Sequence, residues 1–380
     1  MPHSLVALMR RTRLLLDPLG HAKALREVQE AVAITMVTAA YAPLNVFNAK
    51  LASQRKARKR AVGRTLGVAM NQVRAGQALM PVTLVSKGRS HAVPTIPEGA
   101  QYLARRCRCV AGARRYKLYL PASQPKKPQG LIVMLHGCHQ SPDDFAVGTH
   151  MNQLAEKHGL AIAYPQQTRR NNAALCWNWF RPEDQTRGSG EPAILAALTR
   201  KLVRELRIRR DRTFVVGLSA GGAMAAIMID QYPDLFAGAG IHSGLARGAA
   251  EDVISAMSSM RGGGSGDDTT ATLQISAPVR RIVFQGDNDS TVHPSNAANI
   301  VTAVLGEGAT PLRVVNGSVR GRGYTRSTYA HSAGVGTLEL WIVAGAGHAW
   351  SGGKKAGSYT DTTGPDASAQ MVRFFLAKPA

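Results

Sequence analysis

The stretch TFVVGLSAGGAMA, residues Thr213–Ala225, places a serine between an apolar run and a segment rich in small residues. Within it, Gly217, Ser219 and Gly221 fit the pattern G-x-S-x-G, in which a strand turns sharply into a helix and exposes a serine hydroxyl. Glycines on both sides of the serine let the backbone pass close to its neighbours without a Cβ clash. A serine held in this way can act as a nucleophile in acyl transfer, so we predict that Ser219 is catalytic.

A serine nucleophile needs a base, and the base needs a group that orients it. In this type of site the acid and the histidine follow the serine along the chain. The segment DNDSTVHP follows one apolar run and offers Asp287 and Asp289, and AGHAW follows the next and offers His348. We predict Asp289 as the acid in preference to Asp287, because it stands one step further out in the loop, where its side chain can reach back to a histidine.

Three other histidines compete with His348 for the role of base, namely His242, His293 and His331. His348 is preferred because it lies in a glycine-flanked loop after the last apolar run. We interpret the other three as ordinary surface or core histidines.

Acyl transfer also requires hydrogen-bond donors for the negative charge that develops on the carbonyl oxygen. One donor is expected to be the backbone N–H of Ala220, directly after the nucleophile. The other is expected from the segment LHGCHQ (Leu135–Gln140), which follows an early apolar run. In that segment we predict the backbone N–H of Cys138.

These motifs belong to a series of apolar runs that alternate with helical stretches. The alternation predicts a mostly parallel central sheet with helices on both faces, and the motifs then lie at the carboxyl ends of strands, where open α/β sheets place their sites. A helix is expected over Glu191–Leu206 from the spacing of its apolar residues. The expected strands are Tyr116–Pro121, Gly130–Gly137, Leu160–Pro165, Thr213–Gly217, Phe236–Gly244, Arg280–Gly286 and Leu338–Gly345.

The charge of the chain is unevenly distributed. The 380 residues carry a formal net charge of +23, and most of the excess lies in residues 1–130, whereas residues 131–380 are nearly neutral. We therefore predict a basic, partly helical or disordered N-terminal arm over residues 1–100 and a catalytic domain over residues 101–380. The four cysteines are too few for a disulfide scaffold and lack the spacing of a zinc site. Acyl transfer by a serine, a histidine and an aspartate needs no metal and no organic cofactor, so we expect none.

The predicted arm contains a stretch with helical spacing, Ala24–Val37, and a basic run, Arg55–Arg60. Such an arm could bind a polymer granule, nucleic acid or the inner membrane leaflet, and a solvated basic tail without a dedicated partner is the alternative. Arginines interrupt the apolar start of the chain, and Ala31–Phe47 is too short and too rich in alanine and threonine to span a bilayer. We expect no transmembrane segment and a cytoplasmic, granule-associated protein.

With these residues assigned, the chain resembles the esterase family of poly(3-hydroxybutyrate) depolymerases with a type I catalytic domain. The resemblance implies an α/β-hydrolase fold and hydrolysis of short-chain 3-hydroxyalkanoate polyesters or oligomers by Ser219, Asp289 and His348. Related members of the wider group cleave feruloyl or acetyl esters of plant polysaccharides, which makes such an esterase the first alternative. The blocks that carry the resemblance are LHGCHQSPDDFA, QQTRRNNAALCWNWF, VVGLSAGGAMAA, FQGDNDSTVHPSNA and GAGHAWSGG.

The same blocks suggest further site residues. Trp177, Trp179 and Trp350 flank the predicted site in sequence, and we expect them to form an apolar slot for the polyester, with a core position as the alternative for Trp177. Cys138 and Cys176 fall where the family has paired cysteines, so the resemblance implies a disulfide in an oxidising compartment and free thiols in the cytoplasm.

Two departures from the family bear on the substrate. Its secreted members usually carry a signal peptide and a polymer-binding domain, whereas this sequence has the basic arm and ends soon after the last expected helix. We therefore expect amorphous granules or soluble oligomers as substrates, with an extracellular location as the alternative. A basic surface- or nucleic-acid-binding protein with a residual hydrolase domain is a further alternative, and the intact serine, aspartate and histidine weigh against it.

Overall fold

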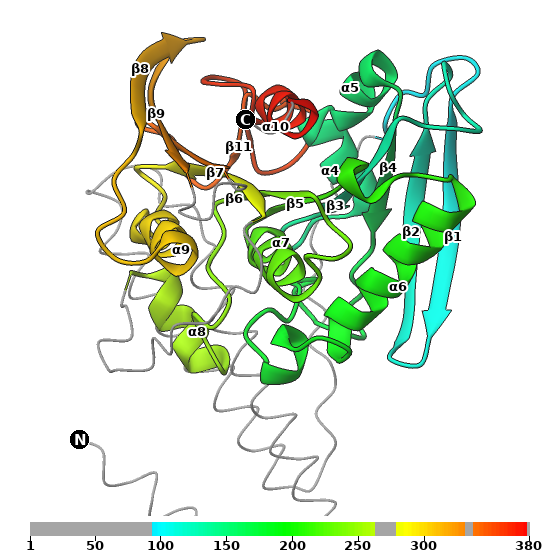
Figure 1. Cartoon of the computed structure of the whole chain (residues 1–380), viewed down its shortest axis with the longest axis horizontal. Coiled ribbons are helices and arrows are strands. Elements are labelled where there is room, and N and C mark those ends of the chain that lie inside the picture. Colours follow the sequence, from blue (N-terminus) through cyan, green and yellow to red (C-terminus); the bar gives the residue numbers. More distant parts are fainter. Residues whose placement is uncertain (1–92, 263–278, 331–336, 378–380) are drawn as a thin grey trace, which may run out of the picture. The chain divides into compact units, whose positions relative to one another are not determined.

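A ten-stranded sheet runs through the described part of the chain, which comprises residues 93–262, 279–330 and 337–377 of this computed structural model (Figure 1). Six neighbouring strands are parallel, and an antiparallel hairpin extends the sheet at each edge. The strands, in their order across the sheet, are β1 (Gln101–Cys109), β2 (Gly112–Leu120), β4 (Leu160–Pro165), β3 (Gly130–Leu135), β5 (Thr213–Leu218), β6 (Gly238–His242), β7 (Arg280–Gly286), β10 (Thr337–Val343), β9 (Arg322–Ala330) and β8 (Arg313–Val319).

Helices cover both faces of this sheet (Figure 1). On one face lie α4 (Pro142–Thr149), α5 (Met151–His158) and α10 (Ala367–Leu376). On the other face lie α6 (Gly190–Glu205), α7 (Ala220–Gln231), α8 (Val253–Met260) and α9 (Ser295–Leu305). Two short strands, β11 (Trp350–Ser351) and β12 (Thr360–Asp361), pair with each other outside the main sheet. This arrangement is the α/β-hydrolase fold.

The hydrophobic core is split into two layers by the sheet. Along β3, Leu131, Val133 and Leu135 pack against the layer beneath α6 and α7. The alternating residues Ile132 and Met134 pack into the layer beneath α4, α5 and α10. Because successive side chains of a strand point to opposite faces, a strand covered on both sides must be apolar at every position. This requirement explains the continuous apolar runs of β3, β4 and β5, in which every residue is buried.

The central strands and the helix predicted over Glu191–Leu206 are confirmed, with ends that differ by a few residues. The sequence patterns did not predict β1, β8 or β9. These strands lie at the sheet edges and are largely exposed or half-buried, so they lack a continuous apolar run. β1, for example, reads QYLARRCRC and buries only Cys107.

Most of the predicted basic arm lies outside the described residues, including Ala24–Val37 and Arg55–Arg60. The division into an arm over residues 1–100 and a domain over residues 101–380 therefore stays a prediction. Among the helices that the structure describes, none has the length and apolar character needed to cross a membrane.

Candidate active site

Ser219 occupies the sharp turn between β5 and α7. Its backbone has φ 57° and ψ −123°, a conformation that residues with a side chain rarely adopt. Two glycines make the turn sterically possible: a Cβ on Gly217 would lie 2.0 Å from the carbonyl oxygen of Gly221, and a Cβ on Gly221 would lie 2.1 Å from that of Leu135. The N–H of Ser219 donates to the carbonyl oxygen of His242 at 2.9 Å, which joins the turn to the end of β6.

The loops after β7 and β10 bring Asp289 and His348 together. Nδ1 of His348 lies 2.8 Å from Oδ2 of Asp289. A carboxylate can only accept, so Nδ1 carries the proton and Nε2 is left with a free lone pair. The second carboxylate oxygen, Oδ1, accepts the backbone N–H groups of Thr291 and Val292, each at 2.9 Å. The imidazole is therefore fixed in the tautomer that a general base needs.

Asp289 is almost completely buried, with 3% of its surface exposed. Burial by itself raises the pKa of this carboxyl. The hydrogen bond from His348 and the N–H groups of Val292 and Thr291 outweigh burial, so the pKa of Asp289 lies below its usual range. The carboxylate thus stays charged beside the histidine at neutral pH.

Asp287, the alternative acid, has a different position. Its Oδ1 accepts the backbone N–H of Gly345 at 2.6 Å, at the start of the loop that carries His348. The structure therefore places Asp289, and not Asp287, on the imidazole. Of the competing histidines, His242 is buried, His293 is exposed beside Ser295, and His331 lies outside the described residues.

Ser219, Asp289 and His348 follow β5, β7 and β10, whose carboxyl ends share one edge of the sheet. Within the described residues the Ser219 side chain makes no hydrogen bond. In enzymes without substrate, the hydrogen bond between the nucleophile and its base is often long, and it tightens only when substrate binds. The arrangement is that of a nucleophile at the same ends of the strands as a base that is already oriented by Asp289.

The segment after β3 lies against the nucleophile turn. A Cβ on Gly137 would be 3.5 Å from the carbonyl oxygen of Leu218, so the residue before Cys138 lies against the residue before Ser219. Cys138 and Ala220 are both buried, and in the described part of the chain neither backbone N–H has a protein acceptor. Buried N–H groups nearly always have a hydrogen-bond partner. Two buried N–H groups without a protein acceptor are therefore available to bind the oxyanion that develops on a substrate carbonyl.

Cys138 is linked to Cys176 by a disulfide. The expectation of free thiols, which was tied to a cytoplasmic location, is therefore wrong for this pair. The bond ties the segment after β3 to the segment between β4 and α6, which carries Trp177 and Asn178. Cys107 and Cys109 are free.

A buried polar network also joins the segment after β3 to the segment between β4 and α6. Nε2 of His136 accepts the backbone N–H of Gln167 at 3.1 Å, and burial lowers the pKa of His136 to about 4, so the ring stays neutral and can accept. The Gln167 side chain donates to the carbonyl oxygen of Cys176 at 2.9 Å. Beneath it, the buried guanidinium of Arg114 donates to Glu191 at 3.0 Å. The position of Cys138 is thus set by several contacts besides the disulfide.

With this geometry established, the comparisons with known proteins identify the family. Residues 114–330 match the family model described as Esterase PHB depolymerase, a range that includes Ser219 and Asp289. The chain belongs to this family.

Relatives of this PHB depolymerase-family chain include several named esterases. Poly(3-hydroxyalkanoate) depolymerase C of Paucimonas lemoignei is 32% identical over 248 residues, which cover 60% of this chain and 56% of that protein. Probable acetylxylan esterase A of Aspergillus clavatus is 25% identical over 193 residues, 47% of this chain and 61% of that protein. The chain thus spans between half and two thirds of the length of these relatives. A solved structure of an acetyl xylan esterase from Aspergillus awamori matches with a TM-score of 0.55 at 18% identity. The match covers 73% of this chain and 98% of that one, and it supports the assignment of the fold.

The tryptophans of this family member require a correction. Trp177 and Trp350 are fully buried, so they have no surface with which to line a slot. A buried indole needs an acceptor for its N–H. Trp177 donates to the carbonyl oxygen of His136 and Trp350 to Oγ of Ser368, both at 3.0 Å. They anchor the segments that carry Cys138 and His348, whereas Trp179, 5% exposed, stays a proposed substrate contact.

Sequence reasoning missed the polar residues that support this site. Gln140, Asp144, Arg114 and Glu191 are all buried and hydrogen-bonded around the segment after β3. Ser141 followed by Asp144 is a helix-capping pattern, and it predicts the start of α4 but not the bonds of Asp144 to the site. Arg114 and Glu191 carried no signal, because nothing in the sequence shows that these charges are buried and paired.

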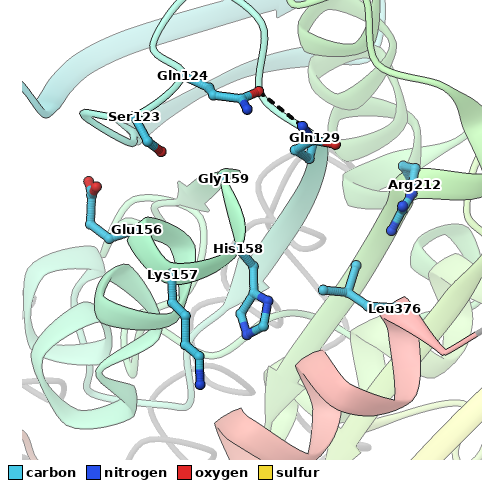
Figure 2. Close-up of a pocket in the computed structure, with 9 residues that line it drawn as sticks. All are labelled: Ser123, Gln124, Gln129, Glu156, Lys157, His158, Gly159, Arg212 and Leu376. Atoms are coloured by element: carbon cyan, nitrogen blue, oxygen red, sulfur yellow. Dashed lines mark hydrogen bonds between the residues drawn. The ribbon is translucent and has the colours of Figure 1, made fainter.

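A separate pocket lies at the amino ends of the central strands, opposite to the ends that carry Ser219 (Figure 2). Gln129, Gly159 and Arg212 of its lining directly precede β3, β4 and β5, at the amino ends of these strands. Gln129 and Gln124 are hydrogen-bonded to each other there, at 3.2 Å. The pocket is therefore distinct from the candidate site around Ser219, which lies at the carboxyl ends of the strands. Across the described ranges, no group of three or more His, Cys, Asp or Glu side chains is arranged to hold a metal ion.

Proposed function

We propose that this chain is a serine carboxylesterase in which Ser219 is the nucleophile, His348 the base and Asp289 the orienting acid. The observation that carries the proposal is the 2.8 Å contact between His348 and Asp289 at the sheet edge where the strained turn presents Ser219. The backbone N–H groups of Cys138 and Ala220 are the proposed oxyanion donors.

The proposed reaction is a double displacement. The Ser219 hydroxyl attacks the ester carbonyl carbon while Nε2 of His348 takes its proton, and the charged oxygen accepts from Cys138 and Ala220. The tetrahedral intermediate collapses, the C–O bond to the alcohol breaks, and the alcohol leaves with the proton from His348. Water then attacks the acyl-enzyme, gives a proton to His348, and releases the acid as that proton returns to Ser219. The sum is ester plus water giving acid plus alcohol.

We propose short-chain 3-hydroxyalkanoate polyesters or oligomers as substrates. The family match and the Paucimonas lemoignei relative support this choice. An acetylxylan or feruloyl esterase is the second candidate, supported by the acetylxylan esterase relatives and by Feruloyl esterase B of Neurospora crassa, 29% identical over 143 residues. Trp179 is proposed to contact the acyl chain.

The disulfide is an argument about the cellular compartment in which the protein works. Disulfides persist in oxidising surroundings and are rare in the cytoplasm. The bond between Cys138 and Cys176 therefore favours an extracellular or otherwise oxidising location over the expected cytoplasmic one. In that setting the substrate is amorphous polymer or soluble oligomer outside the cytoplasm, and the basic arm is proposed to bind the polymer particle.

Substrate turnover tests these proposals. Purified protein is assayed on amorphous poly(3-hydroxybutyrate) particles, p-nitrophenyl butyrate, acetylated xylan and methyl ferulate. Ser219→Ala and His348→Ala are expected to lower kcat by on the order of 10⁶ without loss of folded structure. Substantial hydrolysis by pure Ser219→Ala protein contradicts the nucleophile assignment. Faster turnover of acetylated xylan or methyl ferulate than of the polyester favours the second candidate.

A further inference from the structure

His242 contacts both the turn that carries the nucleophile and the loop that carries the base. It is the last residue of β6, the strand between β5 and β7, and only 2% of its surface is exposed. Its carbonyl oxygen accepts the N–H of Ser219 at 2.9 Å. Its imidazole Nε2 accepts the N–H of Ser351 at 3.0 Å, three residues beyond His348. One residue therefore holds the nucleophile with its main chain and the loop of the base with its side chain.

The tautomer of His242 follows from these contacts. Nε2 accepts, so a neutral ring carries its proton on Nδ1, which lies 3.2 Å from the hydroxyl oxygen of Ser243. Burial, with a smaller contribution from the nearby His348, lowers the pKa of His242 to about 3, and the charge of Asp289 opposes this only in part. The ring is thus a neutral acceptor throughout the working range of an esterase.

Aromatic side chains pack against the same ring. It stacks on Trp350, with ring centroids 5.0 Å apart, and on Phe284, at 5.7 Å. Trp350 precedes Ser351, so the ring packs against one residue of the loop and accepts from the next. Ser351 is itself buried, and its N–H would lose its partner if the acceptor were removed.

We propose that His242 is a positioning residue that sets the distance between Ser219 and His348, because it bonds the turn of the first and the loop of the second. The inference rests on the proposed function of those two residues. It assigns His242 no contact with substrate and no proton transfer in the reaction.

The test compares two replacements of similar length and shape. His242→Gln keeps an acceptor at the position of Nε2, whereas His242→Met lacks it. With p-nitrophenyl butyrate, His242→Met is expected to lower kcat about 100-fold, the scale of a displacement of about 1 Å at a catalytic group, with KM changed little. His242→Gln is expected to recover at least about tenfold of that loss, since the acceptor returns. Equal losses in kcat for the two variants overturn the proposal.

Two controls separate positioning from general damage. Phe284→Leu removes an aromatic ring that stacks on His242 and leaves both hydrogen bonds, so it is expected to lower Tm while kcat stays within a few-fold. A loss of kcat in Phe284→Leu as large as that in His242→Met overturns the proposal. Ser219→Ala reports on the proposed function by itself: if it is inactive while His242→Met keeps full kcat, only the positioning role fails.

A measurement on the unaltered protein covers the case in which His242→Met does not fold. The ¹⁵N spectrum of the histidine rings, with the His242 signals assigned through their loss in His242→Gln, reports the tautomer. We expect a neutral ring with the proton on Nδ1 from pH 8 down to pH 5. A proton on Nε2 in this range overturns the proposal, because Nε2 could not then accept from Ser351.

Discussion

Gln140 donates a hydrogen bond from Nε2 to a carboxylate oxygen of Asp144, with the two atoms 3.0 Å apart and both side chains buried. The amide oxygen of Gln140 accepts the N–H of Gly137 at 2.9 Å. Nε2 also donates to the carbonyl oxygen of Ser358, whose own N–H donates to Asp144 at 2.9 Å. The segment that carries Cys138 and the segment that follows His348 are thus joined through one glutamine and one aspartate.

This relationship predicts the effect of Gln140→Leu. The variant leaves the N–H of Gly137 without an acceptor and loosens the neighbouring Cys138, so we expect kcat on p-nitrophenyl butyrate to fall about tenfold to 100-fold. Gln129→Leu is the matched control, because the same chemical change is made at the exposed pocket on the opposite edge of the sheet. Unchanged kcat in Gln140→Leu would show that this bond does not position the oxyanion donor.

The two candidate acids are separated by a pair of amide substitutions. Asp289→Asn removes the charge beside His348 and allows the wrong tautomer, so kcat is expected to fall by about 10⁴, as in other triads. Asp287→Asn alters only the contact with Gly345 and is expected to keep kcat within a few-fold. Steady-state kinetics on a soluble ester measure both, and the reverse ranking would make Asp287 the acid.

The disulfide between Cys138 and Cys176 is expected to matter for both stability and rate. It closes a loop with a sequence separation of 38, for which chain entropy predicts about 4 kcal/mol of stabilisation. The double variant Cys138→Ala/Cys176→Ala is expected to lose about that much in urea denaturation, with lower kcat because Cys138 is less restrained. Cys109→Ser, at a free cysteine, is the control. Full stability and kcat in the double variant would contradict this role.

The buried histidines predict an acid-sensitive fold. Burial lowers the pKa of His136 to about 4 and that of His242 to about 3, against about 6.5 in an unfolded chain. Between pH 6.5 and about 4 the unfolded chain therefore binds protons that the folded protein does not, so stability present above pH 6.5 is lost as the pH falls. At pH 5 we expect the free energy of unfolding to be lower than at pH 7 by about 2 kcal/mol per histidine.

Urea denaturation at the two pH values checks this expectation. His242→Gln is expected to reduce the loss on acidification, because it removes one of the two groups. Asp184 acts in the opposite direction, since burial and Glu191 raise its pKa to about 6. Below pH 6 the folded protein binds a proton there before the unfolded chain does, so Asp184→Asn is expected to steepen the loss. An identical loss in wild type and His242→Gln would contradict the account for His242.

The basic arm is tested by deletion of residues 1–92. Ile96 and Ala100, which pack against the core, remain in the shortened chain, so activity on soluble esters is expected to stay within a few-fold. Sedimentation with amorphous polymer particles is expected to decrease, and binding by the full chain is expected to weaken as salt is added. A matched full-length variant replaces the five basic residues of Arg55–Arg60 with glutamine. Equal sedimentation of all three forms refutes a targeting role, and retention on duplex DNA alone supports the nucleic-acid alternative.

The sequence by itself determined the central strands and the nucleophile turn. Strands buried on both faces must be apolar throughout, which is why β3, β4 and β5 stand out as continuous runs. The turn at Ser219 could be predicted because its glycines are required by contacts within the turn and with one neighbouring strand. The preference for Asp289 over Asp287 came from the order and spacing of the loops, and the pairing of Cys138 with Cys176 came from resemblance and not from spacing.

Only the tertiary structure decided which polar and aromatic side chains support these residues. Gln140 meets Ser358 across 218 positions of sequence, and His242 meets Ser351 across 109. The sequence around Trp350 looks the same whether this residue lines a substrate slot or lies in the core. Its contacts with His242 and Ser368, which lie on other elements, decide that it is buried. Burial and hydrogen bonding between distant segments arise from packing, and a local sequence pattern contains no record of which segments will pack together.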